Sequence, residues 1–145
     1  MLLRLYGALC DGAMNHNRRS IYKGLILYAE DEKHKNAMQI IEKNYKYKAI
    51  LHDRDTDENG EIKKPHFHYI IKCDNSCPNS TIATALGITE NYIQVILSLK
   101  GAYDYLTHKY SKDKFQYSSS DLFGDLEIED TDKDITDFVD LMQFP

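Results

Sequence analysis

The feature that most constrains the fold is an Asn59-Gly60 pair that lies between two short, mostly apolar segments. Asn-Gly is a strong signal for a hairpin turn, because both residues tolerate a positive φ angle. The flanking segments, residues 47–52 and 66–71, have the length and composition of β-strands. We therefore expect two antiparallel strands joined by a turn at residues 57–61.

Hydrophobic patterning predicts the other elements of the chain. Residues 24–28 form a short apolar run typical of a strand, and residues 32–44 place their apolar side chains on one side of a helix. Further along the chain we expect a helix capped by Asn79 or Ser80 and ended by Gly87, a strand at 92–97 and a short helix at 102–109. The order β-α-β-β-α-β, then a helix, predicts an α+β, ferredoxin-like fold. In this fold a four-stranded antiparallel sheet carries helices on one face.

The domain organisation follows from length and charge. A chain of 145 residues suits one domain. We expect a poorly patterned N-terminal extension at 1–20, a folded domain at 21–120 and an acidic tail at 121–145. The tail holds nine of the 23 Asp and Glu residues, so the rest of the chain is mildly basic although the net charge is −5. A mildly basic body is compatible with nucleic acid. Within the tail, an amphipathic helix is predicted by the spacing of Ile135, Phe138, Val139 and Met142.

Composition also indicates the cellular compartment of the protein. No apolar run approaches 18 residues, so we expect no membrane span, and the first residues are too short an apolar run for a secretory signal. Three cysteines without a disulfide framework indicate a reducing compartment such as the cytoplasm. Cys73 and Cys77 are interpreted as ordinary thiols, because no second pair follows to complete a zinc site.

A candidate metal site lies on the predicted hairpin. Alternate residues of a strand share a face, so His66 and His68 point the same way, about 7 Å apart along the strand, and Phe67 points to the opposite face. His52 and Asp55 lie across the hairpin from them. Three imidazoles and one carboxylate with open positions fit Mn²⁺ or Mg²⁺ in the cell, and zinc, cobalt or nickel as occupants in vitro.

A candidate nucleophile lies in the last predicted helix. Tyr103 and Tyr105 point about 200° apart on a helix, so they cannot have the same role. Tyr105 would share a face with His108 and Lys109, at i+3 and i+4. A phenol has a pKa near 10 and needs help to attack at neutral pH, which a nearby cation gives. Lys109 is the candidate for this role or for gripping a phosphate; the alternative is an ordinary solvated lysine.

These motifs, taken in order, resemble those of the HUH endonuclease superfamily, and within it the small replication initiators of rolling-circle plasmids. The resemblance covers about residues 22–118 and rests on His52-Asp53-Arg54-Asp55, Lys64-Pro65-His66-Phe67-His68 and Tyr105-Leu106-Thr107-His108. It implies a ferredoxin-like fold, a divalent cation held by His52, Asp55, His66 and His68, and Tyr105 as the nucleophile. Asp53 would orient a histidine or simply begin the loop.

The resemblance also implies a function and partners. An initiator of this kind binds the double-strand origin of its plasmid, nicks an exposed single-stranded site and becomes joined to the 5′-phosphate through a phosphotyrosine. A host helicase and DNA polymerase then act from the free 3′-OH. No Gly-rich nucleotide-binding loop is present, which agrees with a separate helicase. The first twenty residues have no counterpart in that family. Larger relatives carry a C-terminal oligomerisation region, so the question whether this chain forms a homo-oligomer stays open.

Three other functions stay open at this stage. A relaxase or transposase of the same superfamily would use the same chemistry on a different DNA. A metal-dependent phosphoesterase acting on a small molecule would use the same ligands but not Tyr105. A non-catalytic DNA-binding module would bind the origin in a salt-dependent way without covalent attachment.

Overall fold

The computed structural model describes residues 20–128. The predicted N-terminal extension, apart from Ser20, and the predicted amphipathic helix at the C-terminus lie outside these residues. Within them the elements are β1 (Ser20–Tyr28), α1 (Glu32–Asn44), β2 (Lys46–His52), β3 (His66–Cys77), α2 (Asn79–Leu86), the 3₁₀ turn η3 (Glu90–Tyr92), β4 (Ile93–Val95), α3 (Leu99–Leu106) and the 3₁₀ turn η4 (Ser119–Asp121).

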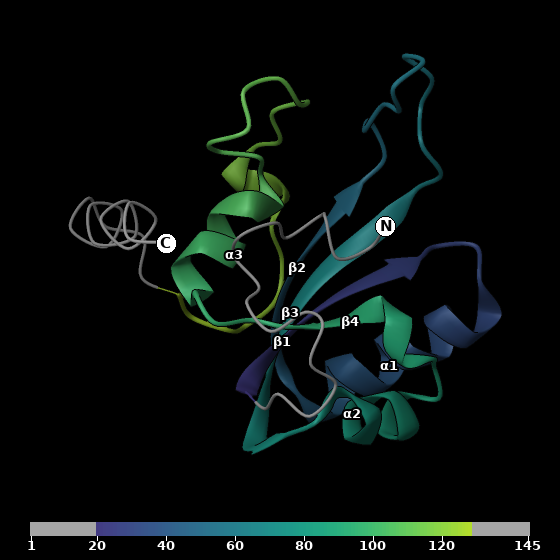
Figure 1. The fold of residues 1–145 in the computed structure, drawn as a ribbon, viewed down its shortest axis with the longest axis vertical. Coiled ribbons are helices and arrows are strands. Elements are labelled where there is room, and N and C mark those ends of the chain that lie inside the picture. Colours follow the sequence, from purple (N-terminus) through teal and green to yellow (C-terminus); the bar gives the residue numbers. More distant parts are fainter. Residues whose placement is uncertain (1–19, 129–145) are drawn as a thin grey trace.

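The strands form one antiparallel sheet in the order β2-β3-β1-β4 (Figure 1). This is the strand order of a ferredoxin-like fold, so the predicted fold class is confirmed. The predicted hairpin is also present, because His52 pairs with His66 at its base. Its tip is a three-residue loop in which Asp57 N–H donates to Glu61 and Gly60 has a φ of 80°.

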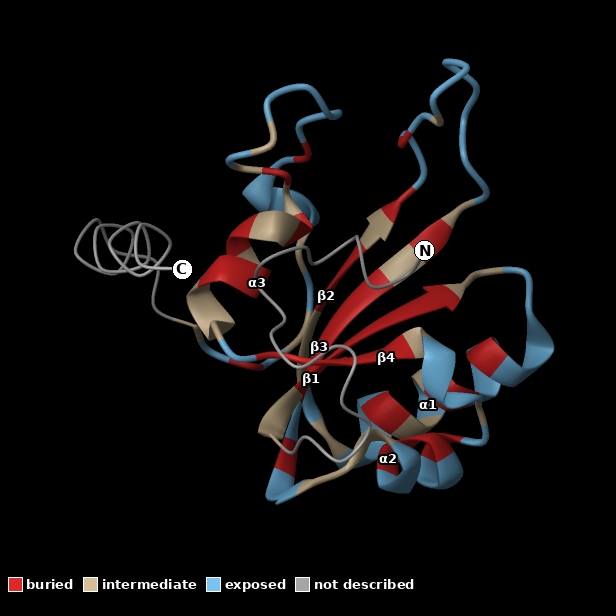
Figure 2. Cartoon of the chain, in the orientation of Figure 1, coloured by how far each residue is buried: buried red, intermediate tan, exposed pale blue. Residues whose placement is uncertain are grey.

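Each face of the sheet buries its own hydrophobic core. Odd-numbered strand residues such as Leu25 and Ile71 pack with α1 and α2 on one face. Even-numbered residues such as Ile26 and Ile70 pack with α3 on the other. The strands are therefore largely buried along their central part (Figure 2). The two helices inside the βαββαβ unit lie on one face, as predicted, and the additional helix α3 covers the opposite face.

Helix α3 lies three residues earlier in the chain than the sequence predicts. It begins after Ser98, whose hydroxyl accepts a hydrogen bond from Gly101 N–H, and it ends at Leu106 rather than at residue 109. The helix cannot continue through His108, because this residue has a φ of 60°, in the left-handed region. The prediction that Tyr105 and Lys109 share a helical face is therefore wrong.

Residues 122–128, part of the predicted acidic tail, pack against the folded domain. Phe123 exchanges two backbone hydrogen bonds with Ala49 of β2, and Leu126 N–H donates to the Tyr47 carbonyl. Gly124 lies between them with a φ of 110°, and a Cβ atom there would lie 2.2 Å from the Tyr47 carbonyl oxygen. This close approach requires glycine. Among the described residues, no helix has the length and apolar composition needed to cross a membrane.

Candidate active site

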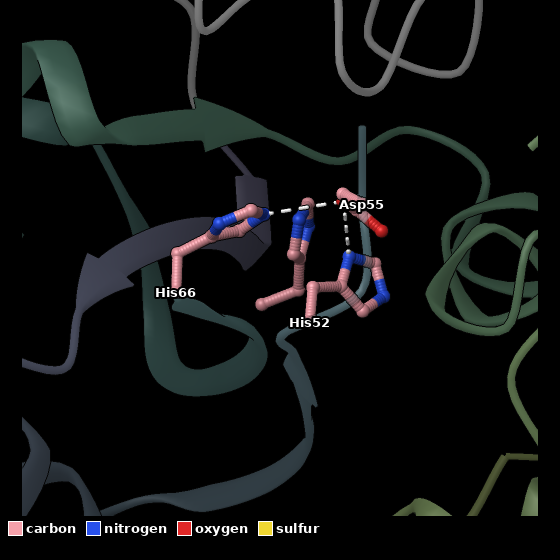
Figure 3. A group of neighbouring side chains, drawn as sticks. His52, Asp55 and His66 are labelled. Carbon is pink, nitrogen blue, oxygen red and sulfur yellow. Dashed lines mark ion pairs between the residues drawn. The ribbon is translucent and has the colours of Figure 1, made fainter. Parts of the chain in front are cut away.

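The four predicted metal ligands converge at the end of the hairpin. One ligand atom from each of His52, Asp55, His66 and His68 lies within 4.8 Å of the others. Figure 3 shows His52 and His66 turned toward Asp55. The three histidines are at most 5% exposed, and Asp55 is 9% exposed. Such a buried group of imidazoles and a carboxylate can hold a metal ion.

Strand register explains this convergence. His52 pairs with His66 and Ile50 pairs with His68, so the three histidines share one face of the sheet. It is the face covered by α3, whereas Phe67 packs on the other face, as predicted. Asp55 follows β2 in the hairpin loop, which turns its carboxylate back over the histidines.

Backbone carbonyls fix two of the imidazoles. His52 Nε2 lies 2.6 Å from the Leu106 carbonyl oxygen, and His66 Nδ1 lies 2.7 Å from that of Lys64. Each of these nitrogens therefore carries the proton and donates it. The other nitrogens, His52 Nδ1 and His66 Nε2, lie 3.2 and 3.4 Å from Asp55 Oδ2. A histidine that donates from its far nitrogen and presents the near one is the usual arrangement at a metal.

The protonation states also suit a cation. Burial alone would raise the pKa of the Asp55 carboxyl, but the proximity of His52 and His66 and the hydrogen bond from Tyr117 hold it well below its ordinary value. Burial, followed by the proximity of His52 and His66, lowers the pKa of His68 well below its ordinary value. A carboxylate anion and a neutral imidazole are the forms that bind metals. The group therefore fits a divalent ion.

Tyr105 lies beside this group, in a cleft of about 250 Å³ between the hairpin loop and the segment after α3. Both segments project from the same end of the sheet (Figure 1). The Tyr105 ring centroid is 6.4 Å from that of His68 and 5.3 Å from that of His108. Lys114 Nζ donates a 2.8 Å hydrogen bond to the Tyr105 hydroxyl. The predicted nucleophile and the predicted ligands are therefore neighbours.

The two other predicted site residues lie at the edge of this arrangement. Lys109 Nζ lies 4.0 Å from Asp104 Oδ1 and over the ring of Tyr110. Asp53 is exposed just after β2. The hydrogen-bond acceptors that orient His52 and His66 are backbone carbonyls and not the Asp53 side chain. The roles predicted for Lys109 and Asp53 stay predictions.

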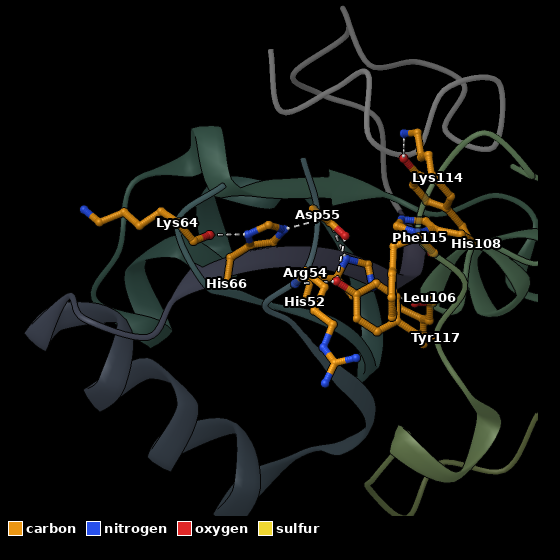
Figure 4. A network of polar contacts seen from close by, with 11 residues as sticks. His52, Arg54, Asp55, Lys64, His66, Leu106, His108, Lys114, Phe115 and Tyr117 are labelled. Atoms are coloured by element: carbon orange, nitrogen blue, oxygen red, sulfur yellow. Dashed lines mark hydrogen bonds and ion pairs between the residues drawn. The ribbon is translucent and has the colours of Figure 1, made fainter. Parts of the chain in front are cut away.

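Sequence reasoning missed two residues of the site, Lys114 and Tyr117 (Figure 4). The Tyr117 hydroxyl donates a 2.8 Å hydrogen bond to Asp55 Oδ1, and its ring stacks on His52. Burial, then the bond to Asp55, raises the pKa of Tyr117, so it stays a neutral phenol. Neither residue lies in a recognisable motif, and only the turn after α3 brings them back to the site.

Comparison with known proteins places these features in a family context. A family model described as "plasmid replication protein, origin binding domain" matches residues 15–129. The chain is similar to replication protein RepB of Lactiplantibacillus plantarum, with 32% identity over 109 residues, which covers 73% of this chain and 50% of RepB. It is also similar to a replication protein of Staphylococcus aureus, with 32% identity over 92 residues, which covers 59% of this chain and 45% of that protein. The chain thus spans about half the length of the curated relatives it matches.

Proposed function

Since this chain belongs to the plasmid replication protein family defined by that origin-binding domain, we propose that it nicks and rejoins one DNA strand at the double-strand origin of a rolling-circle plasmid. The observation that carries the proposal is the convergence of His52, Asp55, His66 and His68 within 4.8 Å, next to the Tyr105 ring. A phosphoryl-transfer site needs a nucleophile beside a site of positive charge, and here the candidate nucleophile lies beside a group of side chains that fits a cation.

In the proposed reaction the Tyr105 hydroxyl oxygen attacks the scissile phosphorus. A bond forms between this oxygen and phosphorus, and the bond from phosphorus to the 3′-oxygen breaks. The phenol proton is released as the new bond forms, and the leaving 3′-oxygen takes up a proton. The products are a 5′-phosphotyrosine and a free 3′-OH. Because one phosphodiester replaces another, the reverse attack by a 3′-OH can rejoin the strand without ATP. Mn²⁺ or Mg²⁺ bound by the four ligands would stabilise the charge on the phosphate and the leaving oxygen.

The residues of this chain have separate roles in this scheme. Lys114 holds the Tyr105 hydroxyl through its 2.8 Å hydrogen bond and presents a positive charge to the cleft. The Leu106 carbonyl keeps His52 turned toward Asp55. The partners that follow are the plasmid origin as double-stranded and locally single-stranded DNA, and a host helicase and polymerase that act from the 3′-OH.

The test is covalent capture of DNA. The 145-residue protein and its Tyr105→Phe variant are incubated with supercoiled plasmid or oligonucleotides that carry the cognate origin, with and without Mn²⁺. Denaturing gels then report the protein–DNA adduct. Tyr103→Phe is the matched control, because it removes a phenol hydroxyl two residues away on the same helix. We expect the adduct for the wild type and for Tyr103→Phe, only with metal, and none for Tyr105→Phe.

Other results would select the alternatives. Metal-dependent cleavage that persists in Tyr105→Phe would indicate hydrolysis by water, as in a phosphoesterase. Origin binding without any adduct in the wild type would indicate a DNA-binding module that has no nicking activity.

A further inference from the structure

We propose that Tyr117 is a positioning residue that holds Asp55 so that a single carboxylate oxygen, Oδ2, faces the histidines. The inference rests on the metal site in the proposed function and extends it to a residue outside the ligand set. Tyr117 lies 62 positions from Asp55 in the chain, in the segment after α3.

The Tyr117 hydroxyl is fixed by two hydrogen bonds. It donates to Asp55 Oδ1 at 2.8 Å, and it accepts from Arg54 N–H at 3.0 Å. Tyr117 is 8% exposed, so water competes little for its hydroxyl. Because the incoming N–H occupies one lone pair, the hydroxyl proton is left to point at Asp55 Oδ1.

The other carboxylate oxygen faces the imidazoles. Asp55 Oδ2 lies 3.2 Å from His52 Nδ1 and 3.4 Å from His66 Nε2, the two nitrogens that are not held by backbone carbonyls. The two oxygens thus have different partners: Oδ1 contacts the phenol, and Oδ2 contacts the ligand nitrogens. One carboxylate oxygen and three imidazoles would leave coordination positions of a bound cation open for a phosphate oxygen. A carboxylate that bound the cation through both oxygens would take one of these positions.

The ring of Tyr117 positions a second ligand. It stacks on the His52 imidazole with a centroid distance of 4.4 Å and an interplanar angle of 8°. The Leu106 carbonyl, 2.6 Å from His52 Nε2, holds the edge of the same imidazole. His52 is therefore fixed both across its face and along its edge, which leaves it little rotational freedom.

The backbone ties Tyr117 to the end of α3. Tyr117 N–H donates to the Thr107 carbonyl at 3.2 Å, and the Phe115 ring packs edge-on against the Tyr117 ring. Thr107 is the second residue after Tyr105, so the segment that carries the nucleophile also fixes the residue that orients Asp55.

The test is metal affinity, which needs no DNA. Metal-free 145-residue wild type and Tyr117→Phe are titrated with Mn²⁺ and with Ca²⁺ by calorimetry. Phe keeps the stacked ring and removes only the hydroxyl. We expect the dissociation constant for Mn²⁺ to rise about 10- to 100-fold, as for other lost partners of metal ligands. Affinity for Ca²⁺ should fall less, because a released carboxylate can bind it through two oxygens.

Tyr47→Phe is the matched control, because it removes a half-buried phenol hydroxyl on the other face of the sheet. If Tyr117→Phe is partly unfolded without metal, the Mn²⁺-dependent rise in its unfolding temperature gives the same comparison. Unchanged Mn²⁺ affinity in Tyr117→Phe, or an equal loss for Mn²⁺ and Ca²⁺, would overturn the role of Tyr117 and leave the proposed nicking function standing. No Mn²⁺ binding by the wild type would overturn the metal site itself.

Discussion

His52 Nε2 lies 2.6 Å from the carbonyl oxygen of Leu106, the residue that directly follows Tyr105. This contact joins a candidate metal ligand at the end of β2 to the end of α3, although the two residues are 54 positions apart. Since both groups are buried, the bond fixes their relative position. The distance between the candidate nucleophile and the ligand group is therefore set by the packing of α3 on the sheet.

The roles of Lys114 and Lys109 can be distinguished by substituting each residue with methionine, which keeps the length of the side chain and removes its charge. We expect Lys114→Met to slow formation of the covalent adduct by roughly tenfold or more, because a charged hydrogen bond contributes about 1.5–3 kcal/mol and Lys114 donates to the Tyr105 hydroxyl. Lys109→Met should have a smaller effect. Single-turnover rates with Mn²⁺ and an origin oligonucleotide measure both. A larger loss in Lys109→Met would instead support the role that the sequence suggested for it.

Metal binding should stabilise the fold through the buried ligands. A ligand that binds only the folded state, at 100 times its dissociation constant, adds about 2.7 kcal/mol to the free energy of unfolding. We expect Mn²⁺ to raise the unfolding temperature of the wild type, and a chelator to reverse this. His68→Gln should lose most of the rise, because His68 is a fully buried member of the ligand group.

His34→Gln is the control for that experiment, since His34 is a buried histidine outside the ligand group. This variant should keep the Mn²⁺-dependent rise. An equal rise in His68→Gln and the wild type would exclude His68 as a ligand.

The fold and the grouping of the candidate ligands were accessible from the sequence because they depend on local rules. The Asn59-Gly60 turn defined the hairpin, and alternation along the strand placed His66 and His68 on one face, as the structure confirms. These features repeat every two residues or depend on one turn, so short windows of sequence reveal them.

The surroundings of the site were not accessible, because they depend on tertiary contacts. Helix α3 ends early because His108 takes up a left-handed conformation and its Nδ1 bonds to the Phe115 carbonyl. This turn brings Lys114, instead of Lys109, to the Tyr105 hydroxyl. Asn79 was predicted as a candidate cap for α2, but its side chain accepts a hydrogen bond from buried Lys23. Propensity rules do not include partners that are distant in the chain.

His34 should make stability depend on pH. Its Nδ1 accepts a hydrogen bond from Tyr28 N–H, and burial lowers its pKa below the ordinary 6.5. The unfolded chain therefore binds a proton near pH 6.5 when the folded protein does not, so stability falls as pH drops below about 6.5. His34→Asn keeps an acceptor without titrating. Denaturant unfolding without metal, from pH 7.5 downward, should show a smaller loss of stability in His34→Asn than in the wild type. If the free energy of unfolding falls equally with pH in both proteins, His34 is not a neutral, buried residue in the folded state.

Gly124 should tolerate alanine less well than Gly60 does. Gly60→Ala introduces a side chain at a φ of 80° where nothing lies within 4 Å, so it costs only the left-handed conformation, about 1–2 kcal/mol. Gly124→Ala pays a similar cost at a φ of 110° and also places Cβ 2.2 Å from the Tyr47 carbonyl oxygen. We expect it to lower the free energy of unfolding by about 1–3 kcal/mol more than Gly60→Ala, the usual cost of overpacking. Urea unfolding of both variants measures the difference. Equal losses would mean that Phe123 and its neighbours can move away from Ala49 of β2 without cost. In that case residues 122–128 would contribute nothing to the stability of the domain.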